Sequence, residues 1–413
     1  MTSCIAVNKE SFGVMWKTVS EACNLKCDYC YYSRCGGNPG KINRIDSKIL
    51  EKFIKEYMEI NNGAAGFVWQ GGEPLLAGLD FFEEVVFLQR KYAPPYAHIS
   101  NSIQTNATLI TEEWAQFFKQ YQFLVGVSLD GPKQIHDARR ITGSGKGSFD
   151  QVMRGIDYLK KYGVSFNILS VIHEGNVGNA KELMAFYDKQ GFSYVQFIPC
   201  MDFRSQEIDK EGKYLITPEE FGQFLCEAFD YWYNHGNPQR SVRFFDNLLS
   251  MYLHQGAELC IHREACPKML VLEQNGDAYP CDFFIHEDYK IGNIGNDSLE
   301  AILNHSLYEQ FLNLKPTLPD KCKSCEYLNL CHGGCPRSRG DQGKDVDYFC
   351  ESYMQLYRYA DSRMKHLSEK VRINWLQTAV KRGEKFPKRN ETCLCGSGEK
   401  FKKCCGHLIN NVM

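Results

Sequence analysis

The pattern of hydrophobic residues in the first half of the chain alternates between two periods. Short runs rich in Val, Ile and Phe predict strands, and between them apolar residues recur every three or four positions, as on one helix face. Because strand and helix alternate six times, we expect a parallel sheet covered by helices, in the form of a partial (β/α)6 barrel. The expected strands are 13–19, 66–70, 99–104, 123–129, 165–172 and 194–199; the expected helices begin after Asp46 and Thr111 or span 81–92, 149–162 and 178–190.

The second half of the chain has a different pattern. The alternation stops near Thr217, a helix is predicted over 218–233, and the strand-like pieces that follow, 269–273 and 278–281, are short. A helix from 349 to about 370 is expected to complete a small, cysteine-rich α+β domain. We therefore predict four parts: a barrel over 1–216, a cysteine-rich domain over 217–370, a polar linker over 371–390 and a short tail over 391–413.

Bulk composition excludes several classes of partner. The chain has 413 residues, of which 43% are hydrophobic and 24% charged, as in an ordinary globular protein, and its net charge of −2 gives no reason to expect nucleic acid or an anionic membrane. The N-terminus has no basic segment followed by an apolar run, and no apolar run approaches the length of a membrane span. We expect a cytoplasmic monomer.

The number of cysteines, nineteen, is the unusual feature of the composition. The cytosol keeps thiols reduced, so a disulfide framework is not expected, and scattered buried thiols would not gather at short spacings. Grouping of this kind indicates metal binding. The groups are Cys23, Cys27 and Cys30; Cys260, Cys266 and Cys281; Cys322, Cys325, Cys331, Cys335 and Cys350; and Cys393, Cys395, Cys404 and Cys405.

The first group has the spacing C-x₃-C-x₂-C. Three thiolates can hold three irons of a [4Fe–4S] cubane and leave the fourth iron open to a ligand. Spacing alone also allows a zinc site completed by Cys35, or a redox C-x₂-C pair. Polar motifs at 70–74, 104–106 and 128–132 follow the next three strands, and in parallel barrels the carboxyl ends of the strands hold the chemistry.

This cysteine loop, with an aromatic residue after it and Gly-Gly-Glu-Pro after the second strand, resembles the radical S-adenosylmethionine superfamily. The resemblance implies that the cofactor binds the open iron and is cleaved to a 5′-deoxyadenosyl radical, which takes a hydrogen atom from the substrate. Matched by motif, the residues implied to contact the cofactor are Tyr29, Gly72, Ser128, Arg140 and Met201. The alternatives are a surface charge at Arg140 and ordinary packing at Met201.

The eight cysteines from Cys260 to Cys350 are the number required by two fully ligated [4Fe–4S] clusters, although spacing alone also allows two zinc sites. Their pattern resembles the SPASM domain, which carries twin clusters in radical enzymes that modify peptides. The resemblance implies two interleaved ligand sets. One is Cys260, Cys266, Cys281 and Cys335, and the other is Cys322, Cys325, Cys331 and Cys350.

Several motifs between 14 and 364 are similar to those of anaerobic sulfatase-maturating enzymes, among them Gln70-Gly-Gly-Glu-Pro, Gln104-Thr-Asn and Tyr279-Pro-Cys-Asp-Phe. This resemblance implies oxidation of a Cys or Ser in an unfolded sulfatase segment to Cα-formylglycine, with an electron donor such as flavodoxin or ferredoxin. It also implies that Asp282, next to Cys281, is the base; a bracing role in the cluster loop is the alternative.

Two other functions compete with this one. A radical maturase that forms thioether or carbon–carbon crosslinks in a ribosomal peptide usually carries an N-terminal recognition domain, for which the residues before the first strand leave no room. A non-catalytic iron–sulfur or zinc module would not need both the cysteine loop and Gly-Gly-Glu-Pro. Cleavage of the cofactor by the purified protein would separate an enzyme from such a module.

The last cysteine group is a separate signal. Its spacing, C-x-C-x₈-C-C in a Gly- and Lys-rich tail, resembles the SEC-C motif, which implies one zinc ion held by Cys393, Cys395, Cys404 and Cys405. His407 competes with Cys405 for the fourth position. We expect the tail to bind a partner or substrate rather than to carry chemistry.

Overall fold

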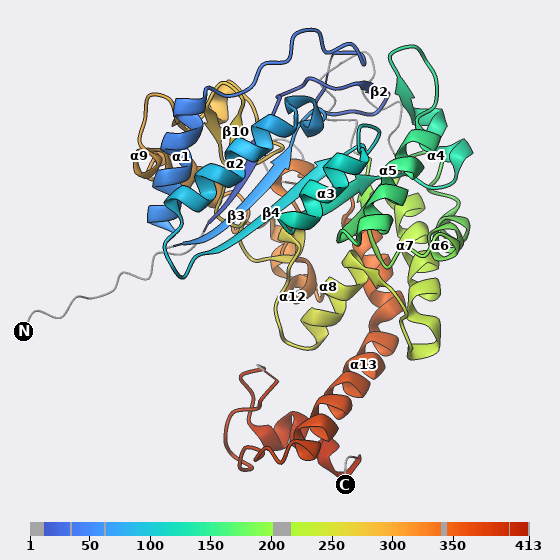
Figure 1. The fold of residues 1–413 in the computed structure, drawn as a ribbon. Helices are drawn as coiled ribbons and strands as arrows, with labels where there is room; N and C mark the ends of the chain where they lie inside the picture. The colour runs from blue at the N-terminus through green and yellow to red at the C-terminus, as the bar shows by residue number, and fades with distance from the viewer. Residues whose placement is uncertain are drawn as a thin grey trace, which may run out of the picture. The chain divides into compact units, whose positions relative to one another are not determined.

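The computed structural model describes residues 12–33, 35–61, 63–200, 216–339, 345–395 and 397–411 (Figure 1). The chain folds into two compact units, each made of several segments. The first unit comprises 1–175, 198–215 and 267–314, and the second comprises 176–197, 216–266 and 315–413. Each unit is described by itself below.

The first unit is built on a mainly parallel sheet. Neighbouring strands in the order β10-β1-β3-β4-β5-β7 are parallel, and β11 and β12 extend the β10 edge in antiparallel fashion. This arrangement confirms the predicted α/β class. The strands are β1 (Gly13–Lys17), β3 (Ala64–Gln70), β4 (His98–Thr105), β5 (Leu124–Ser128), β7 (Phe166–Ile172), β10 (Met269–Glu273), β11 (Asp277–Tyr279) and β12 (Gly292–Asn293).

Helices connect successive parallel strands and cover one face of this sheet, where Figure 1 shows α1, α2 and α3 side by side. Two of them begin where the sequence predicts: the side chain of Asp46 accepts a hydrogen bond from Lys48 N, and that of Thr111 from Trp114 N. Behind them the rings of Trp16, Phe53 and Trp69 form a buried aromatic core. The helices are α1 (Ser47–Ile60), α2 (Leu79–Tyr92), α3 (Glu112–Gln120), α4 (Lys133–Arg139), α5 (Phe149–Tyr162), α9 (Leu299–Leu303) and α10 (Ser306–Leu312).

Strand register brings three polar side chains to the same edge of the sheet. Lys17, the last residue of β1, pairs with Gln70 at the end of β3 and with Glu273 at the end of β10. A second, two-stranded sheet pairs β2 (Leu25–Cys27) with β6 (Arg140–Thr142) and sets Cys27 opposite Arg140. These two alignments position the site described below.

The second unit is mainly helical. Helix α7 begins with a capping box at Thr217 and packs closely against α13, where a Cβ atom at Gly222 would lie 3.2 Å from the Cα of Ser352. In this unit β8 (Tyr194–Pro199) pairs with β9 (Ser241–Val242) in parallel. The helices are α6 (Ala180–Lys189), α7 (Pro218–Tyr233), α8 (Arg243–Tyr252), α11 (Asp320–Lys323), α12 (Leu328–Cys331) and α13 (Cys350–Lys381).

The structure differs from the sequence predictions at two boundaries. Residues 267–314 belong to the first unit, because β10 adds to the sheet beside β1, so the compact units do not follow the predicted division at 216/217. Helix α13 continues to Lys381, so residues 371–381 are not a linker. Leu376 and Ile373 on this last part of α13 pack against the tail, and this packing accounts for the longer helix.

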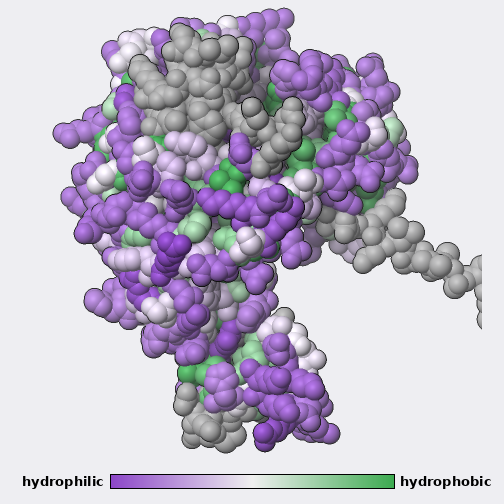
Figure 2. All heavy atoms as spheres, turned by 180° about the vertical axis from the view of Figure 1, so that it is seen from behind, coloured by the Kyte–Doolittle hydropathy of each residue, from purple (hydrophilic) through white to green (hydrophobic). Residues whose placement is uncertain are grey.

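No helix in the described part of the chain is long and apolar enough to cross a membrane. On the face shown in Figure 2, hydrophobic side chains are scattered among hydrophilic ones.

Candidate functional site

The first cysteine group lies in a loop at the carboxyl end of β1, around the short strand β2. Cys23 is buried, Cys27 and Cys30 are half-buried, and Cys30 N donates to Cys27 O at 3.1 Å. Burial raises the pKa of Cys27 to about 12 and also raises that of Cys23, and in each case a neighbouring cysteine of the group adds to the rise. Thiols of this kind become thiolates only beside a strong positive charge, so the donor set suits an iron–sulfur cluster.

The side chain of Cys35 does not stand with the three cysteines of the first group as a fourth ligand but contacts the backbone of the loop. Its thiol donates to Cys23 O at 3.1 Å and accepts from Cys23 N at 3.3 Å. Cys35 therefore braces the backbone of the loop, which weakens the alternative of a zinc site completed by this residue.

The motif after β3 holds the cysteine loop in place. Gly72 has a φ of +51°, and a Cβ atom there would lie 2.0 Å from Ala22 O, so only glycine lets the two backbones approach. The next residue, Glu73, is fully buried, and its N–H donates to the same Ala22 O at 2.8 Å.

Glu73 also ties the cysteine loop to β4. Its carboxylate accepts hydrogen bonds from Thr105 Oγ1 at 2.6 Å, Asn106 N at 2.7 Å and Leu75 N at 3.1 Å. Asn106 in turn donates to Asn24 Oδ1 at 2.8 Å, inside the cysteine loop. Glu73 belongs to the Gly-Gly-Glu-Pro motif, but nothing in the sequence indicated that its carboxylate would be buried and would accept these hydrogen bonds.

Two of the predicted cofactor contacts meet at a buried carboxylate. Arg140 donates through Nε and Nη2 to the two oxygens of Asp130, at 2.8 and 3.1 Å, and the hydroxyl of Tyr29 also bonds Asp130. Burial opposes the charge on Asp130, but the guanidinium of Arg140 outweighs it and lowers the pKa of this carboxyl. Arg140 is therefore buried and paired with Asp130, so the alternative of a surface charge at this position is wrong.

The other predicted contacts have separate positions. Ser128, at the end of β5, accepts a hydrogen bond from Gln104 Nε2 at 3.0 Å. The ring of Tyr29 stacks on His173, with centroids 5.6 Å apart. Met201 lies outside the described residues.

Asp282 follows β11, and its side chain reaches the end of β1. Its carboxylate contacts the ammonium of Lys17 and accepts a hydrogen bond from the hydroxyl of Tyr31 at 2.8 Å. Because Tyr31 directly follows Cys30, the carboxylate reaches the residues that flank the cysteine loop. The geometry therefore joins the candidate base to the candidate radical-forming site within one unit.

The partners of Asp282 are themselves held from several sides. Lys17, only 1% exposed, also reaches Gln70 Oε1 at 3.5 Å and lies 4.4 Å from the ring centroid of Tyr32. The hydroxyl of Tyr32 donates to Glu273 at 2.6 Å. This cluster was not predictable from the sequence, because lysine, glutamine and glutamate at strand ends give no local signal of burial.

The second unit brings together one complete predicted cysteine set. A small cavity is lined by Cys322, Cys325, Cys331 and Cys350, with the rings of Tyr327, Tyr353 and Tyr357 around them. In the other set, Cys260 lies within electrostatic range of both Cys266 and Cys335 in the same unit. The fourth predicted ligand of that set, Cys281, belongs to the first unit.

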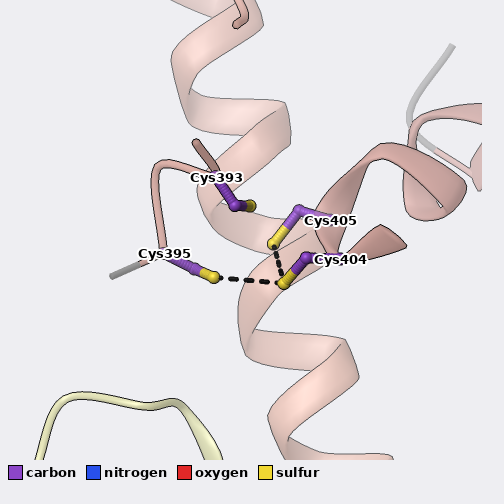
Figure 3. A group of neighbouring side chains, drawn as sticks. All are labelled: Cys393, Cys395, Cys404 and Cys405. Atoms are coloured by element: carbon purple, nitrogen blue, oxygen red, sulfur yellow. Dashed lines mark hydrogen bonds between the residues drawn. The ribbon is translucent and has the colours of Figure 1, made fainter. Parts of the chain in front are cut away.

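The tail folds around its four cysteines. The sulfur atoms of Cys393, Cys395, Cys404 and Cys405 are buried, point toward one another and all lie within 4.8 Å of each other (Figure 3). Sulfurs this close can all bind one zinc ion at about 2.3 Å. His407 is exposed and is not part of this group.

Comparison with known proteins identifies the family to which the chain belongs. Models of the radical SAM superfamily, the SPASM iron–sulfur cluster-binding domain and the SEC-C motif match residues 18–187, 264–326 and 389–406. The cysteine-type anaerobic sulfatase-maturating enzyme of Clostridium perfringens (strain ATCC 13124) is 35% identical over 364 residues, which cover 86% of this chain and 98% of the relative. This chain belongs to the family of anaerobic sulfatase-maturating enzymes.

Other members of the sulfatase-maturating family are about as similar. The serine-type enzyme of Bacteroides thetaiotaomicron is 34% identical over 381 residues, covering 87% of this chain and 91% of that one. The structure of native anSMEcpe with bound AdoMet and Cp18Cys peptide matches with a TM-score of 0.81 and 36% identity, over 87% of this chain and 99% of the other. Streptococcus suis SuiB, at 17% identity and a TM-score of 0.60, shares the fold.

These matches confirm the family, the fold class and the cofactors predicted from the sequence. The enzyme is a radical SAM enzyme with a SPASM domain, and such domains use S-adenosylmethionine and [4Fe–4S] clusters. The role of each individual ligand and contact residue stays a prediction.

Proposed function

We propose that this enzyme oxidises a cysteine or serine side chain in a sulfatase segment to Cα-formylglycine. Relatives of both the cysteine type and the serine type, at 35% and 34% identity, support this function without separating the two substrates. The observation that carries the proposal is the position of Asp282, whose carboxylate meets Tyr31 beside the cysteine loop.

The residues of the first unit supply binding and positioning. Bound at a cubane on Cys23, Cys27 and Cys30, S-adenosylmethionine supplies the radical that removes a hydrogen atom from the substrate Cβ. Tyr29, Gly72, Ser128, Arg140 and Met201 are the residues that we propose to surround the cofactor. The bidentate ion pair between Asp130 and Arg140 fixes the orientation of that guanidinium.

Asp282 then acts as the base. It takes the proton from the substrate thiol or hydroxyl, while Lys17 and Tyr31 hold its carboxylate in one orientation. Cys260, Cys266, Cys281 and Cys335 would hold an auxiliary cluster, which would supply an acceptor for the electron that the substrate loses. An electron donor of the flavodoxin or ferredoxin class would supply the electron that cleaves S-adenosylmethionine. The substrate thus loses one hydrogen atom, one proton and one electron. A serine side chain gives the aldehyde directly, whereas a cysteine side chain gives a thioaldehyde, which water converts to the aldehyde with release of hydrogen sulfide.

The second auxiliary cluster is proposed on Cys322, Cys325, Cys331 and Cys350, which line one cavity. The tail is proposed to hold one zinc ion on Cys393, Cys395, Cys404 and Cys405 and to bind a partner or substrate. The exposed side chain of Leu394, between two of these cysteines, is available for such a contact.

Anaerobic incubation with S-adenosylmethionine, a one-electron reductant and a sulfatase-type peptide, in cysteine and serine versions, tests the proposal. We expect mass spectrometry to detect an aldehyde in at least one version, and the variant with Cys23, Cys27 and Cys30 changed to Ala should produce neither aldehyde nor 5′-deoxyadenosine. A crosslinked peptide in place of the aldehyde would overturn the proposal in favour of a peptide-crosslinking maturase.

A further inference from the structure

Lys315 is a buried lysine inside the cysteine-rich part of the second unit, with 1% of its surface exposed. Its ammonium donates to Ile261 O at 3.0 Å and also to Gly334 O. These carbonyls belong to the residue after Cys260 and the residue before Cys335. The ammonium therefore lies between the two chain segments that carry three of the predicted ligands of one auxiliary cluster.

The charges around Lys315 point to an anion at this position. Lys315 interacts electrostatically with the thiols of Cys335, Cys266 and Cys260, and no carboxylate among the described residues lies within ion-pair distance of it. Burying an ammonium without a nearby negative charge is costly. A cubane held by four thiolates is an anion, and it would supply the missing charge.

The other charged groups nearby do not replace that anion. Asp347 is buried and interacts with Lys315 at longer range, but its oxygens accept hydrogen bonds at 2.8 Å from Cys335 N and Phe349 N. Arg339 is a second buried cation, and it donates to the backbone carbonyl of Lys315 at 3.1 Å. Arg339 fixes the segment that carries Lys315 but adds positive charge.

We propose that Lys315 raises the reduction potential of the auxiliary cluster held by Cys260, Cys266 and Cys335. Its fixed positive charge stabilises the reduced cluster more than the oxidised one, since reduction adds one negative charge. Lys315 would thus favour transfer of the electron from the deprotonated substrate radical to this cluster; the role of the cluster as acceptor rests on the proposed function. In this proposal Lys315 acts through the cluster and is a positioning residue.

Three variants of the full-length, reconstituted enzyme test this inference without substrate. Lys315→Met removes the charge and keeps a similar length, and Lys315→Arg keeps the charge. Lys323→Met removes a lysine that is exposed and pairs only at the surface with Asp320. Iron content and the midpoint potentials of the clusters, from a redox titration followed by electron paramagnetic resonance, are measured for each variant.

We expect Lys315→Met to keep its iron and to lower the midpoint potential of one auxiliary cluster by at least about 59 mV, which is tenfold in the one-electron equilibrium. Lys315→Arg and Lys323→Met should leave that potential near the wild-type value. Unchanged potentials in iron-loaded Lys315→Met, or an equal shift in Lys323→Met, would overturn the inference.

Loss of iron is also decisive. If Lys315→Met loses about four irons while Lys315→Arg keeps them, the positive charge is needed to hold the cluster rather than to tune its potential, and the inference fails. If both variants lose them, Lys315 only braces the loop, and the inference fails. Because no substrate is present, none of these results depends on whether the enzyme makes formylglycine.

Discussion

The ammonium of Lys17 contacts the carboxylate of Asp282, although the two residues lie near opposite ends of the first unit in sequence. The parallel pairing of β10 with β1 sets Glu273 in register with Lys17. Asp282 follows the antiparallel strand β11, and its side chain reaches the ammonium of Lys17 from there. With Tyr31 as its second partner, Asp282 is fixed in orientation before any substrate arrives.

Lys17→Met should lower the rate of aldehyde formation by about 10²-fold, the cost of a misplaced catalytic group. The buried ammonium would no longer hold Asp282, but the cysteine loop and its iron should remain. The measurement is kcat and KM for the peptide, together with iron content. The loss should fall on kcat rather than on KM.

Lys133→Met is the matched control, because that lysine forms an exposed ion pair with Asp150 and such pairs contribute little. A loss of iron in Lys17→Met equal to its loss of activity would show that Lys17 supports the fold rather than Asp282.

Gly72→Ala should abolish both the first cubane and cleavage of S-adenosylmethionine. A positive φ costs a residue with a side chain roughly 1–2 kcal/mol, and the new Cβ would meet Ala22 O in the cysteine loop. Gly13→Ala, where nothing lies within 4 Å of the new Cβ, is the control and should keep both. Normal iron content with weakened cofactor binding in Gly72→Ala would instead favour a direct cofactor contact.

The tail should bind one zinc ion through Cys405 and not through His407, because only the cysteine lies in the buried sulfur group. Metal analysis of the reconstituted enzyme should give about twelve irons and about one zinc per chain. Cys405→Ser should lose the zinc and become more sensitive to protease after α13, whereas His407→Ala should keep the zinc. The opposite pattern in these two variants would contradict the assignment.

Local signals in the sequence were sufficient to predict several helices and strands and to recognise the cysteine groups. Helix α5 and strand β10 have the predicted bounds, and the helix starts at Asp46 and Thr111 follow from side-chain caps that act within a few residues. The cysteine groups could be recognised in the sequence because their members lie close together in the chain.

Residues whose role depends on tertiary packing were not predictable in this way. Glu73, Lys17 and Lys315 are ordinary surface residue types, and only the folded chain shows that they are buried beside the cysteine loops. The helical state of 371–381 likewise depends on contacts of Leu376 with the tail, so the polar composition of this stretch suggested a linker.

The central claim is that Asp282 removes the proton that turns the substrate radical into product. Its most direct test is the ratio of aldehyde to 5′-deoxyadenosine in Asp282→Asn, measured with iron content on one preparation. The control is Asp288→Asn, because Asp288 is an exposed carboxylate in the same stretch.

In Asp282→Asn we expect full iron and continued formation of 5′-deoxyadenosine, because removal of the hydrogen atom does not need the base. Aldehyde should fall by about 10²–10⁴-fold, the usual contribution of a positioned base, while Asp288→Asn should match the wild type. Near-normal aldehyde in iron-loaded Asp282→Asn would contradict the account.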